Sequence, residues 1–308
     1  MTQQPAQSPL HRSSPRHPST HPPVPRAPRT FQGRLATLLE MIKFRHSVFA
    51  LPFALAAMVV AAGGWPSLWT FFWVVAACVA ARSMAMAYNR LADRELDARN
   101  PRTRDRALPA GLISPSFTRG FILVSGALFV LAAGMLNPLC LLLSPLAILL
   151  LLGYSHCKHY THDAHFVLGA ALGIAPLGAW IAVRGSFEGL PVFLALGVLL
   201  WTAGFDIIYS CLDVEVDRRE GLHSLPARVG IGPALSAAAW LHLVSVICFA
   251  LFVWEAGLSG RAWAALAIVT TLLFFEHRQV RPDDLSRVGP AFFTFNAAIS
   301  IVFFLGVI

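Results

Sequence analysis

Residues 66–97 read PSLWTFFWVVAACVAARSMAMAYNRLADRELD, an apolar run that ends abruptly in a cluster of charges. As a helix, the apolar part 66–88 is long enough to cross a hydrocarbon core about 30 Å thick. Asn89, Asp93 and Asp97 then follow at four-residue steps. Carboxylates so close to lipid are costly unless a cation or water meets them. The stretch therefore predicts a membrane-spanning helix that ends in a polar site.

Apolar runs of this kind recur along the whole chain. Hydrophobic residues make up 56% of the 308 and charged residues only 13%, against about 25% charged residues in a typical soluble domain. The runs lack the alternation of a membrane β-barrel. We therefore predict an all-α polytopic membrane bundle, with about nine transmembrane helices around a central cavity that opens to the cytoplasmic side and to lipid. The predicted spans are 47–63, 66–88, 117–135, 137–154, 166–183, 190–211, 232–254, 260–275 and 290–307.

The N-terminal segment differs from the rest of the chain in composition. It is rich in Pro, Ser, His and Arg, and the first carboxylate of the chain is Glu40. Such a segment buries too little apolar surface to fold alone, so we expect 1–35 to be a disordered basic tail and 40–308 to be the membrane domain. The tail has no apolar h-region, so we expect no signal peptide there.

The basic residues predict the orientation of the spans. With the N-terminus in the cytoplasm, all but two of the 24 Lys and Arg residues lie on the inner side, the exceptions being Arg184 and Arg261. This bias is the positive-inside pattern of a protein of the cytoplasmic (inner) membrane. The net charge of +8 is therefore attributed to topology, and we expect the lipid bilayer, and no nucleic acid, as a partner.

A second carboxylate cluster repeats the four-residue step at the end of another span. It runs Asp206-x-x-Tyr209-x-x-x-Asp213-x-x-x-Asp217. On an α-helix such steps stay within one face, so each cluster is expected to present one polar face. A single carboxylate at a membrane surface is commonly just a solvated loop residue, but two clusters spaced alike on one side favour a site. We expect the clusters to meet and to bind Mg²⁺, which prefers carboxylate, water and phosphate oxygens.

Basic side chains accompany the carboxylates. The first cluster is surrounded by Arg90, Arg94, Arg99, Arg102, Arg104 and Arg106, and Lys158 lies on the next inner loop. Guanidinium and ammonium groups bind phosphate oxygens through charge-assisted hydrogen bonds. Acidic, basic and apolar groups together indicate a site for a lipid diphosphate. A calcium-binding EF-hand is excluded for 213–224, because Arg218 and Ser224 stand where that loop needs Gly and Glu.

These motifs resemble those of the UbiA superfamily of intramembrane prenyltransferases. Residues 89–109 are similar to its first aspartate-rich motif with the arginine tail, residues 206–224 to its second motif, and Tyr154-x-x-x-Lys158 to its basic loop segment. The resemblance covers about 40–308. It implies that Mg²⁺ on the two motifs holds the diphosphate of an isoprenoid, which leaves as an allylic cation forms. An electron-rich aromatic ring then attacks the cation and loses a proton.

The resemblance also implies roles for individual residues. Mg²⁺ is expected on Asp93, Asp97, Asp213 and Asp217, with Asn89 assisting. The diphosphate of the polyprenyl substrate is expected on Arg94, Arg102, Arg106 and Lys158. Asp206 and Tyr209 are the catalytic candidates, which orient the acceptor hydroxyl or receive its proton. Lys43 and Arg45 are candidates for binding an acceptor carboxylate.

The acceptor stays open between two aromatic carboxylates. Lys43, His159 and His223 replace an Arg, an Arg and a Lys that are common in 4-hydroxybenzoate enzymes, and segments 43–52 and 276–287 look like a subgroup linked in part to menaquinone assembly through 1,4-dihydroxy-6-naphthoate. We expect 4-hydroxybenzoate, with the dihydroxynaphthoate as the alternative. Prenylation of haem or chlorophyll type fits the second cluster less well. A transporter would place its charges near the bilayer midplane, not at helix ends.

Overall fold

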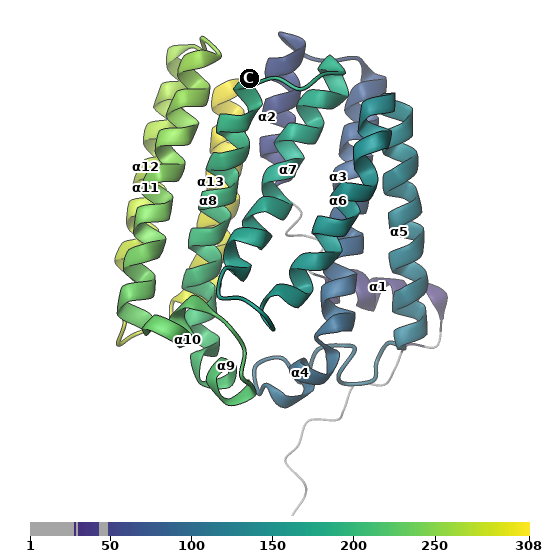
Figure 1. The fold of residues 1–308 in the computed structure, drawn as a ribbon, viewed down its shortest axis with the longest axis vertical. Coiled ribbons are helices and arrows are strands. Elements are labelled where there is room, and N and C mark those ends of the chain that lie inside the picture. The colour runs from purple at the N-terminus through teal and green to yellow at the C-terminus, as the bar shows by residue number, and fades with distance from the viewer. Residues whose placement is uncertain (1–27, 29, 43–48) are drawn as a thin grey trace, which may run out of the picture.

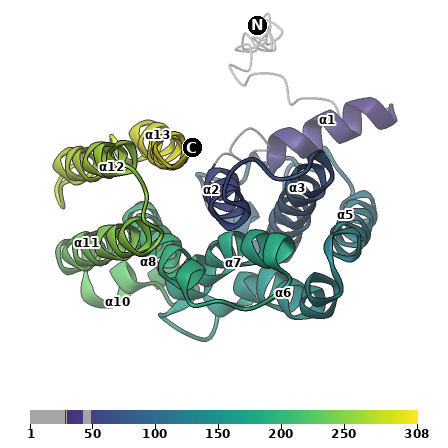
Figure 2. The ribbon, with the colours of Figure 1, turned by 90° about the horizontal axis from the view of Figure 1, so that it is seen from above.

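The computed structural model describes residues 28, 30–42 and 49–308, and its regular elements over these ranges are helices. Nine of the described helices run side by side along the long axis of the molecule (Figures 1 and 2). They are α2 (Leu51–Ala62), α3 (Leu68–Ala92), α5 (Pro115–Leu136), α6 (Pro138–Cys157), α7 (Ala164–Arg184), α8 (Leu190–Ser210), α11 (Ile231–Glu255), α12 (Gly260–Gln279) and α13 (Val288–Val307). Each coincides with a predicted span, and the predicted all-α class is confirmed.

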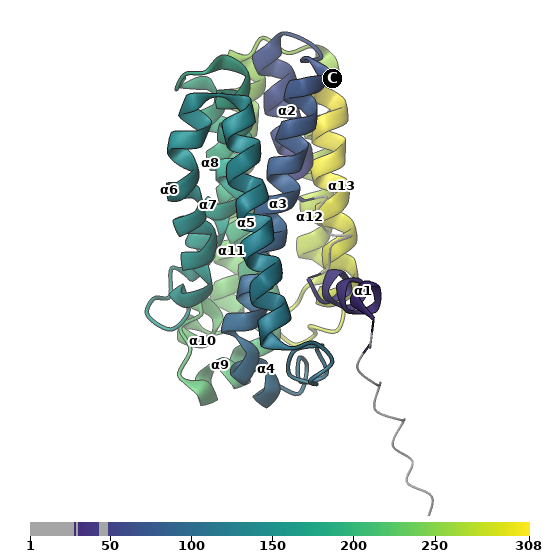
Figure 3. The ribbon, with the colours of Figure 1, turned by 90° about the vertical axis from the view of Figure 1, so that its right-hand side faces the viewer.

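The remaining elements are short. The helices α4 (Arg94–Arg99), α9 (Val214–Glu220) and α10 (Leu225–Val229), with the 3-10 helix η2 (Cys211–Asp213), lie together at the lower end of Figure 1. We call this end of the bundle the motif end. The helix α1 (Phe31–Met41) lies crosswise to the bundle near the same end (Figure 3). It spans the boundary expected between tail and membrane domain, and that division stays a prediction.

Six of the described helices are long and apolar enough to cross a membrane, namely α3, α5, α6, α7, α8 and α11. The helix α2 has only 12 residues, and α12 carries Arg261 and Glu276 near its two ends. The count of nine spans therefore stays a prediction. The outward side chains suit hydrocarbon: Leu68, Leu142 and Trp254 are 86%, 75% and 71% exposed. Apolar surface left in contact with water on this scale would be unfavourable.

The helices begin and end where the sequence supplies caps. Ser67, Ser114 and Asn137 each accept a hydrogen bond from a backbone N–H in the first turn of α3, α5 and α6, at 3.1, 3.2 and 2.9 Å. Gly63 and Gly185 end α2 and α7 with φ of 66° and 70°, a backbone conformation that other residues rarely adopt. Both helix ends lie within one residue of the ends of the predicted spans 47–63 and 166–183.

The interior of the bundle is aromatic where α2, α8, α11 and α13 meet. Phe53, Trp201, Phe249 and Phe303 are fully or almost fully buried. The ring centroid of Phe53 lies 5.2 Å from that of Trp201, 5.4 Å from that of Phe249 and 5.3 Å from that of Phe303. Each such side chain buries a large apolar area. This cluster joins the helix of the first predicted span, α2, to the C-terminal helices α11 and α13.

Candidate active site

The first carboxylate cluster lies at the joint between α3 and α4. Asp93 links the two helices, and its neighbours keep helical hydrogen bonds: the N–H of Asp93 donates to Asn89 O (2.9 Å), and the N–H of Asp97 donates to Asp93 O (2.7 Å). Both carboxylates are buried, at 5% and 7% exposure. Lys158 Nζ lies 2.7 Å from Asp93 Oδ2, and Arg106 Nη1 lies 2.8 Å from both oxygens of Asp97. Each buried charge thus has a basic partner.

The second cluster begins in the last two turns of α8, with Asp206 and Tyr209, and continues beyond the end of that helix. Arg102 pairs with the Asp213 carboxylate through Nε, at 3.0 Å, and through Nη2. The Nη1 of the same guanidinium donates to Tyr209 Oη at 2.8 Å. Asp217, one turn into α9, is buried and accepts a hydrogen bond from Ser224 Oγ at 2.7 Å. One arginine from the first motif therefore holds two residues of the second.

Further contacts join the two motifs across more than a hundred residues of sequence. Asn100 Nδ2 donates to Asp213 Oδ1 at 3.1 Å. Arg99 Nε lies 3.2 Å from Glu220 Oε2, and Arg219 donates to the Arg99 carbonyl at 3.3 Å. The meeting of the two clusters, expected from their spacing and orientation, is confirmed by these contacts.

Neither cluster lies on one unbroken helix, although the backbone hydrogen bonds from Asp93 to Asn89 and from Asp97 to Asp93 are kept at the first joint. The helix α3 ends at Ala92, and Asp93 has φ −86° and ψ 4°. The helix α8 ends at Ser210, and Asp213 has φ −110° and ψ 5°. In both segments the helix is interrupted next to or at an aspartate. Near these joints the carboxylates pair with basic side chains from other segments: Asp93 with Lys158, Asp97 with Arg106, and Asp213 with Arg102.

Asp206 lies one turn inside α8, next to a residue that the sequence analysis did not select. His165 Nδ1 lies 2.7 Å from Asp206 Oδ2, and the backbone N–H of Leu225 donates to His165 Nε2 at 3.2 Å. His165 is 4% exposed, at the start of α7. A single histidine at a helix start has no motif spacing, so its only sequence signal was its place at the motif end opposite Asp206.

The remaining predicted site residues differ in the contacts that they make. Lys43 and Arg45 lie outside the described residues. The side chain of Arg94 is exposed. Asn89 Nδ2 donates to Asp93 Oδ2 at 3.2 Å, so it supports a predicted metal ligand. Asn100, which was not among the predicted site residues, is 9% exposed and bridges the motifs.

The electrostatics of the site favour additional positive charge. Burial raises the pKa of the Asp217 carboxyl, the Ser224 hydrogen bond opposes the rise, and the neighbouring charge of Asp213 adds to it. Burial alone would lower the pKa of Arg102, but hydrogen bonding and charge from Asp213 outweigh it, and the pKa is raised. Arg102 therefore stays charged, while Asp217 lacks a basic partner of its own at hydrogen-bond distance among the described residues.

The donor set fits a hard divalent cation. In the described part of the chain no three His, Cys, Asp or Glu side chains are already gathered as a metal site. However, Mg²⁺ needs only one or two carboxylates and takes its other ligands from water and substrate phosphate. The Oδ1 atom of Asp93 is buried and has no hydrogen-bond partner among the described residues. A buried carboxylate oxygen of this kind is well suited to receive a cation.

Comparison with known proteins agrees with the motifs and the fold. The model of the UbiA prenyltransferase family matches residues 50–300. A 4-hydroxybenzoate octaprenyltransferase of Xanthomonas campestris pv. campestris (strain B100) is 31% identical over 292 residues, which cover 92% of this chain and 95% of that protein. The chain is therefore similar to curated enzymes over nearly its whole length.

Solved structures share the architecture. A UbiA homolog from Aeropyrum pernix K1, in its apo form, matches with a TM-score of 0.79 and 32% identity over 86% of this chain and 97% of that one. A UbiA homolog from Archaeoglobus fulgidus, bound to GPP and Mg²⁺, matches with a TM-score of 0.68 over 88% of this chain and 98% of that one; at 19% identity it supports the fold alone. This chain belongs to the UbiA prenyltransferase family and is a multi-pass membrane polyprenyltransferase.

Proposed function

We propose that the chain transfers a polyprenyl group from polyprenyl diphosphate to a ring carbon of 4-hydroxybenzoate, in a Mg²⁺-dependent reaction of respiratory quinone biosynthesis. The observation that carries this proposal is the joining of the two aspartate motifs at one end of the bundle, where Arg102 and Asn100 of the first contact Asp213 of the second. The names of the curated relatives support 4-hydroxybenzoate as acceptor.

Asp93, Asp97, Asp213 and Asp217 are the proposed holders of Mg²⁺. When bound, the metal neutralises the diphosphate and makes it a better leaving group. Lys158, Arg106 and Arg102 now pair with these carboxylates. Once the carboxylates hold a cation, the same three side chains become available to the diphosphate oxygens, where charge develops as the leaving group departs. Arg94, exposed on α4, is proposed to reach the diphosphate from the rim.

The transfer step is a substitution at the allylic carbon. The carbon–oxygen bond to diphosphate breaks, with its electron pair going to the leaving oxygen, and a ring carbon of the acceptor forms the new carbon–carbon bond. The ring then loses a proton and regains its aromaticity. Asp206, held by His165, and Tyr209, held by Arg102, are the proposed groups that orient the acceptor hydroxyl or receive its proton. Lys43 and Arg45 are proposed to bind the acceptor carboxylate.

The apolar bundle supplies what the intermediate needs. A developing allylic cation must be kept from water, and aromatic faces can stabilise its positive charge. We propose that the motif end faces the cytoplasm of a cell with the chain in its cytoplasmic membrane, because nearly all Lys and Arg residues lie on that side of the predicted spans. Soluble aromatic acceptors would then reach the site from the cytoplasm.

The test is an assay in membranes that contain the full chain. Mg²⁺ and labelled polyprenyl diphosphate are offered with 4-hydroxybenzoate or with 1,4-dihydroxy-6-naphthoate in separate reactions. We expect prenylated 4-hydroxybenzoate, loss of product with EDTA, and loss of product in Asp93→Ala. The matched control is Asp105→Ala, since Asp105 is an exposed carboxylate of the same segment. Product only with the naphthoate would assign the chain to menaquinone assembly, and no product with either would reject both acceptors.

A further inference from the structure

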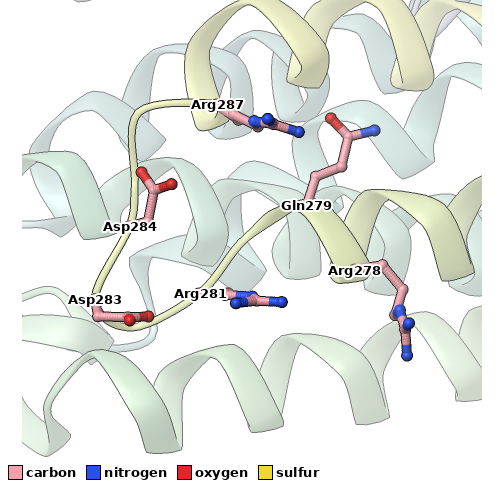
Figure 4. A pocket seen from close by; sticks show the side chains of 6 residues that line it. All are labelled: Arg278, Gln279, Arg281, Asp283, Asp284 and Arg287. Atoms are coloured by element: carbon pink, nitrogen blue, oxygen red, sulfur yellow. The ribbon is translucent and has the colours of Figure 1, made fainter.

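A polar hollow lies at the motif end of the bundle. It has a volume of about 390 Å³ and sits at the connection between α12 and α13. Figure 4 shows its lining: Arg278, Gln279, Arg281, Asp283, Asp284 and Arg287. None of these residues belongs to the carboxylate motifs or to the groups assigned above. Three guanidinium groups around one hollow point to an anionic ligand.

The connection is an ordered turn. The backbone N–H groups of Arg281 and Asp284 donate to each other's carbonyl oxygens at 3.3 and 3.2 Å. Asp284 Oδ1 accepts from the N–H of Ser286 at 3.0 Å and from its Oγ at 2.6 Å. One of the two carboxylates of the hollow is thus engaged in building the turn. In Figure 4 the side chains of Gln279, at the end of α12, and Arg287, which directly precedes α13, extend toward each other across the hollow.

An exposed apolar face leads along α12 to this hollow. Ile268, Phe274 and Phe275 are 51%, 58% and 52% exposed. The guanidinium of Arg278, one turn beyond Phe274, lies 5.7 Å from the centre of the Phe274 ring. Arginine at this position can keep its stem on apolar surface and its charge at the interface. Apolar helix face and basic hollow together form one amphipathic surface.

We propose that this surface binds an anionic phospholipid, with the headgroup phosphate in the hollow lined by Arg278, Arg281 and Arg287 and an acyl chain along the exposed face of α12. Basic pockets between membrane helices recognise such headgroups because the phosphate lies at the depth where the helices end. A soluble anion would use the guanidinium groups equally well but would have no use for Phe274 and Phe275. The apolar face beside the charges is therefore the reason to assign a lipid.

The experiment uses the purified full chain in nanodiscs of phosphatidylcholine with a graded fraction of phosphatidylglycerol, with bound lipid counted by native mass spectrometry after release. The test variant is Arg281→Gln/Arg287→Gln. The control is Arg119→Gln, an exposed arginine on α5 at the same end of the bundle, which corrects for general attraction of basic protein to anionic lipid. Both substitutions keep a polar side chain on an exposed site, and thermal unfolding of each variant checks its folding.

We expect wild type and Arg119→Gln to retain phosphatidylglycerol alike, because Arg119 lies outside the hollow. The double variant should need at least about tenfold more of it, since each removed arginine takes away a charge-assisted hydrogen bond to the headgroup phosphate. Equal retention by all three proteins would overturn the site. Release of the lipid by millimolar inorganic phosphate, or by micromolar geranyl diphosphate, would assign the hollow to a soluble anion or to substrate and would overturn the lipid proposal.

Discussion

His165 has a defined proton in this structure, and that proton explains its place beside Asp206. The backbone N–H of Leu225 donates to Nε2, so Nε2 carries the lone pair and the ring proton is assigned to Nδ1. Nδ1 then donates to Asp206 Oδ2. A histidine held through both ring nitrogens has a fixed orientation and can orient its partner carboxylate. His165 therefore acts as a positioning residue for the proposed acceptor-side carboxylate.

Replacing His165 tests this role. In His165→Leu the donor is lost, and we expect kcat to fall about tenfold to a hundredfold, because a misplaced proton acceptor loses part of its usual contribution. In His165→Asn a side-chain N–H can still reach Asp206, and much of the activity should return. The measurement is steady-state kinetics with varied acceptor and varied polyprenyl diphosphate. A purely structural role would lower kcat equally in both variants.

Asn100 offers an isosteric test of the joint between the motifs. Its Nδ2 donates to Asp213 Oδ1, and its Oδ1 accepts from the N–H of Arg102 at 2.9 Å. In Asn100→Asp an oxygen replaces the donor and faces the Asp213 carboxylate. Like charges so close repel, so we expect kcat/KM for the polyprenyl diphosphate to fall at least tenfold. Asn100→Ser, which can still donate, should lose less. Equal activity of wild type and Asn100→Asp would show that the bridge is dispensable.

The site residues that could be predicted from the sequence are of a type that is rare in their sequence context, whereas those that were missed are common in theirs. A carboxylate beside an apolar run is costly in a membrane, so Asp93 and Asp213 were conspicuous. His165 and Asn100 are polar residues at helix ends, where polar residues are common, and nothing local marks them. Their importance comes from contacts over 41 and 113 residues of sequence. Contacts between residues so far apart in the sequence can be identified only once the fold is known.

At the scale of elements, the approach of α7 to α8 sets the distance between His165 and Asp206. Gly169 and Gly173 stand one turn apart on α7 and face the backbone of α8. A Cβ atom built on Gly169 would lie 2.3 Å from Leu199 O, and one on Gly173 would lie 2.7 Å from Ala195 O. Such small residues at one-turn spacing let membrane helices pack closely.

Gly169→Ala tests this packing. Because a Cβ atom cannot stand so close to a backbone carbonyl, the helices must separate, and we expect a loss of about 1–3 kcal/mol in stability with reduced activity. The control is Gly178→Ala on the same helix, where a Cβ atom would meet nothing within 4 Å. Alanine there should be neutral or slightly stabilising. Thermal unfolding in detergent, followed by size-exclusion chromatography, compares them. An unchanged midpoint for Gly169→Ala would contradict the close contact.

The elements show where the sequence was sufficient and where it was not. Caps and chain breaks are local signals, so helix starts such as those at Ser67 and Asn137 could be predicted. The turn of the chain at Asp93 was missed because the sequence around it continues a helical pattern. At this turn Lys158 and Arg106, which lie on other segments, pair with the buried carboxylates of Asp93 and Asp97.

At the scale of the whole molecule, composition predicted an all-helical membrane protein because no other class tolerates so much apolar sequence with so little charge. The order of packing around the bundle could not be predicted. It depends on which helix faces carry residues small enough to let two helices approach closely. It also depends on aromatic contacts such as that of Phe53 with Phe303, which joins the first span to the last helix. That the two motifs share one end follows from the order of the spans, whereas these contacts determine which helices are neighbours.

The final prediction concerns which end of the bundle faces the cytoplasm. Tyr160, 82% exposed, lies at the motif end, and Phe187, 68% exposed, lies at the opposite end between α7 and α8. In a background with the five native cysteines replaced by serine, we expect Phe187→Cys to react with a membrane-impermeant maleimide in intact spheroplasts. Tyr160→Cys should react only after the membrane is opened.

The cysteine-free parent sets the background for this labelling, and labelling in inverted vesicles should show the opposite pattern. Reaction of Tyr160→Cys in intact spheroplasts would place the motif end outside the cell, against the distribution of Lys and Arg residues. The polyprenyl diphosphate and the aromatic acceptor would then have to reach the aspartates from the outer side. With the motif end inside, the anionic substrate, its Mg²⁺ and the released diphosphate all stay in the cytoplasm, and only the prenyl chain lies in the lipid.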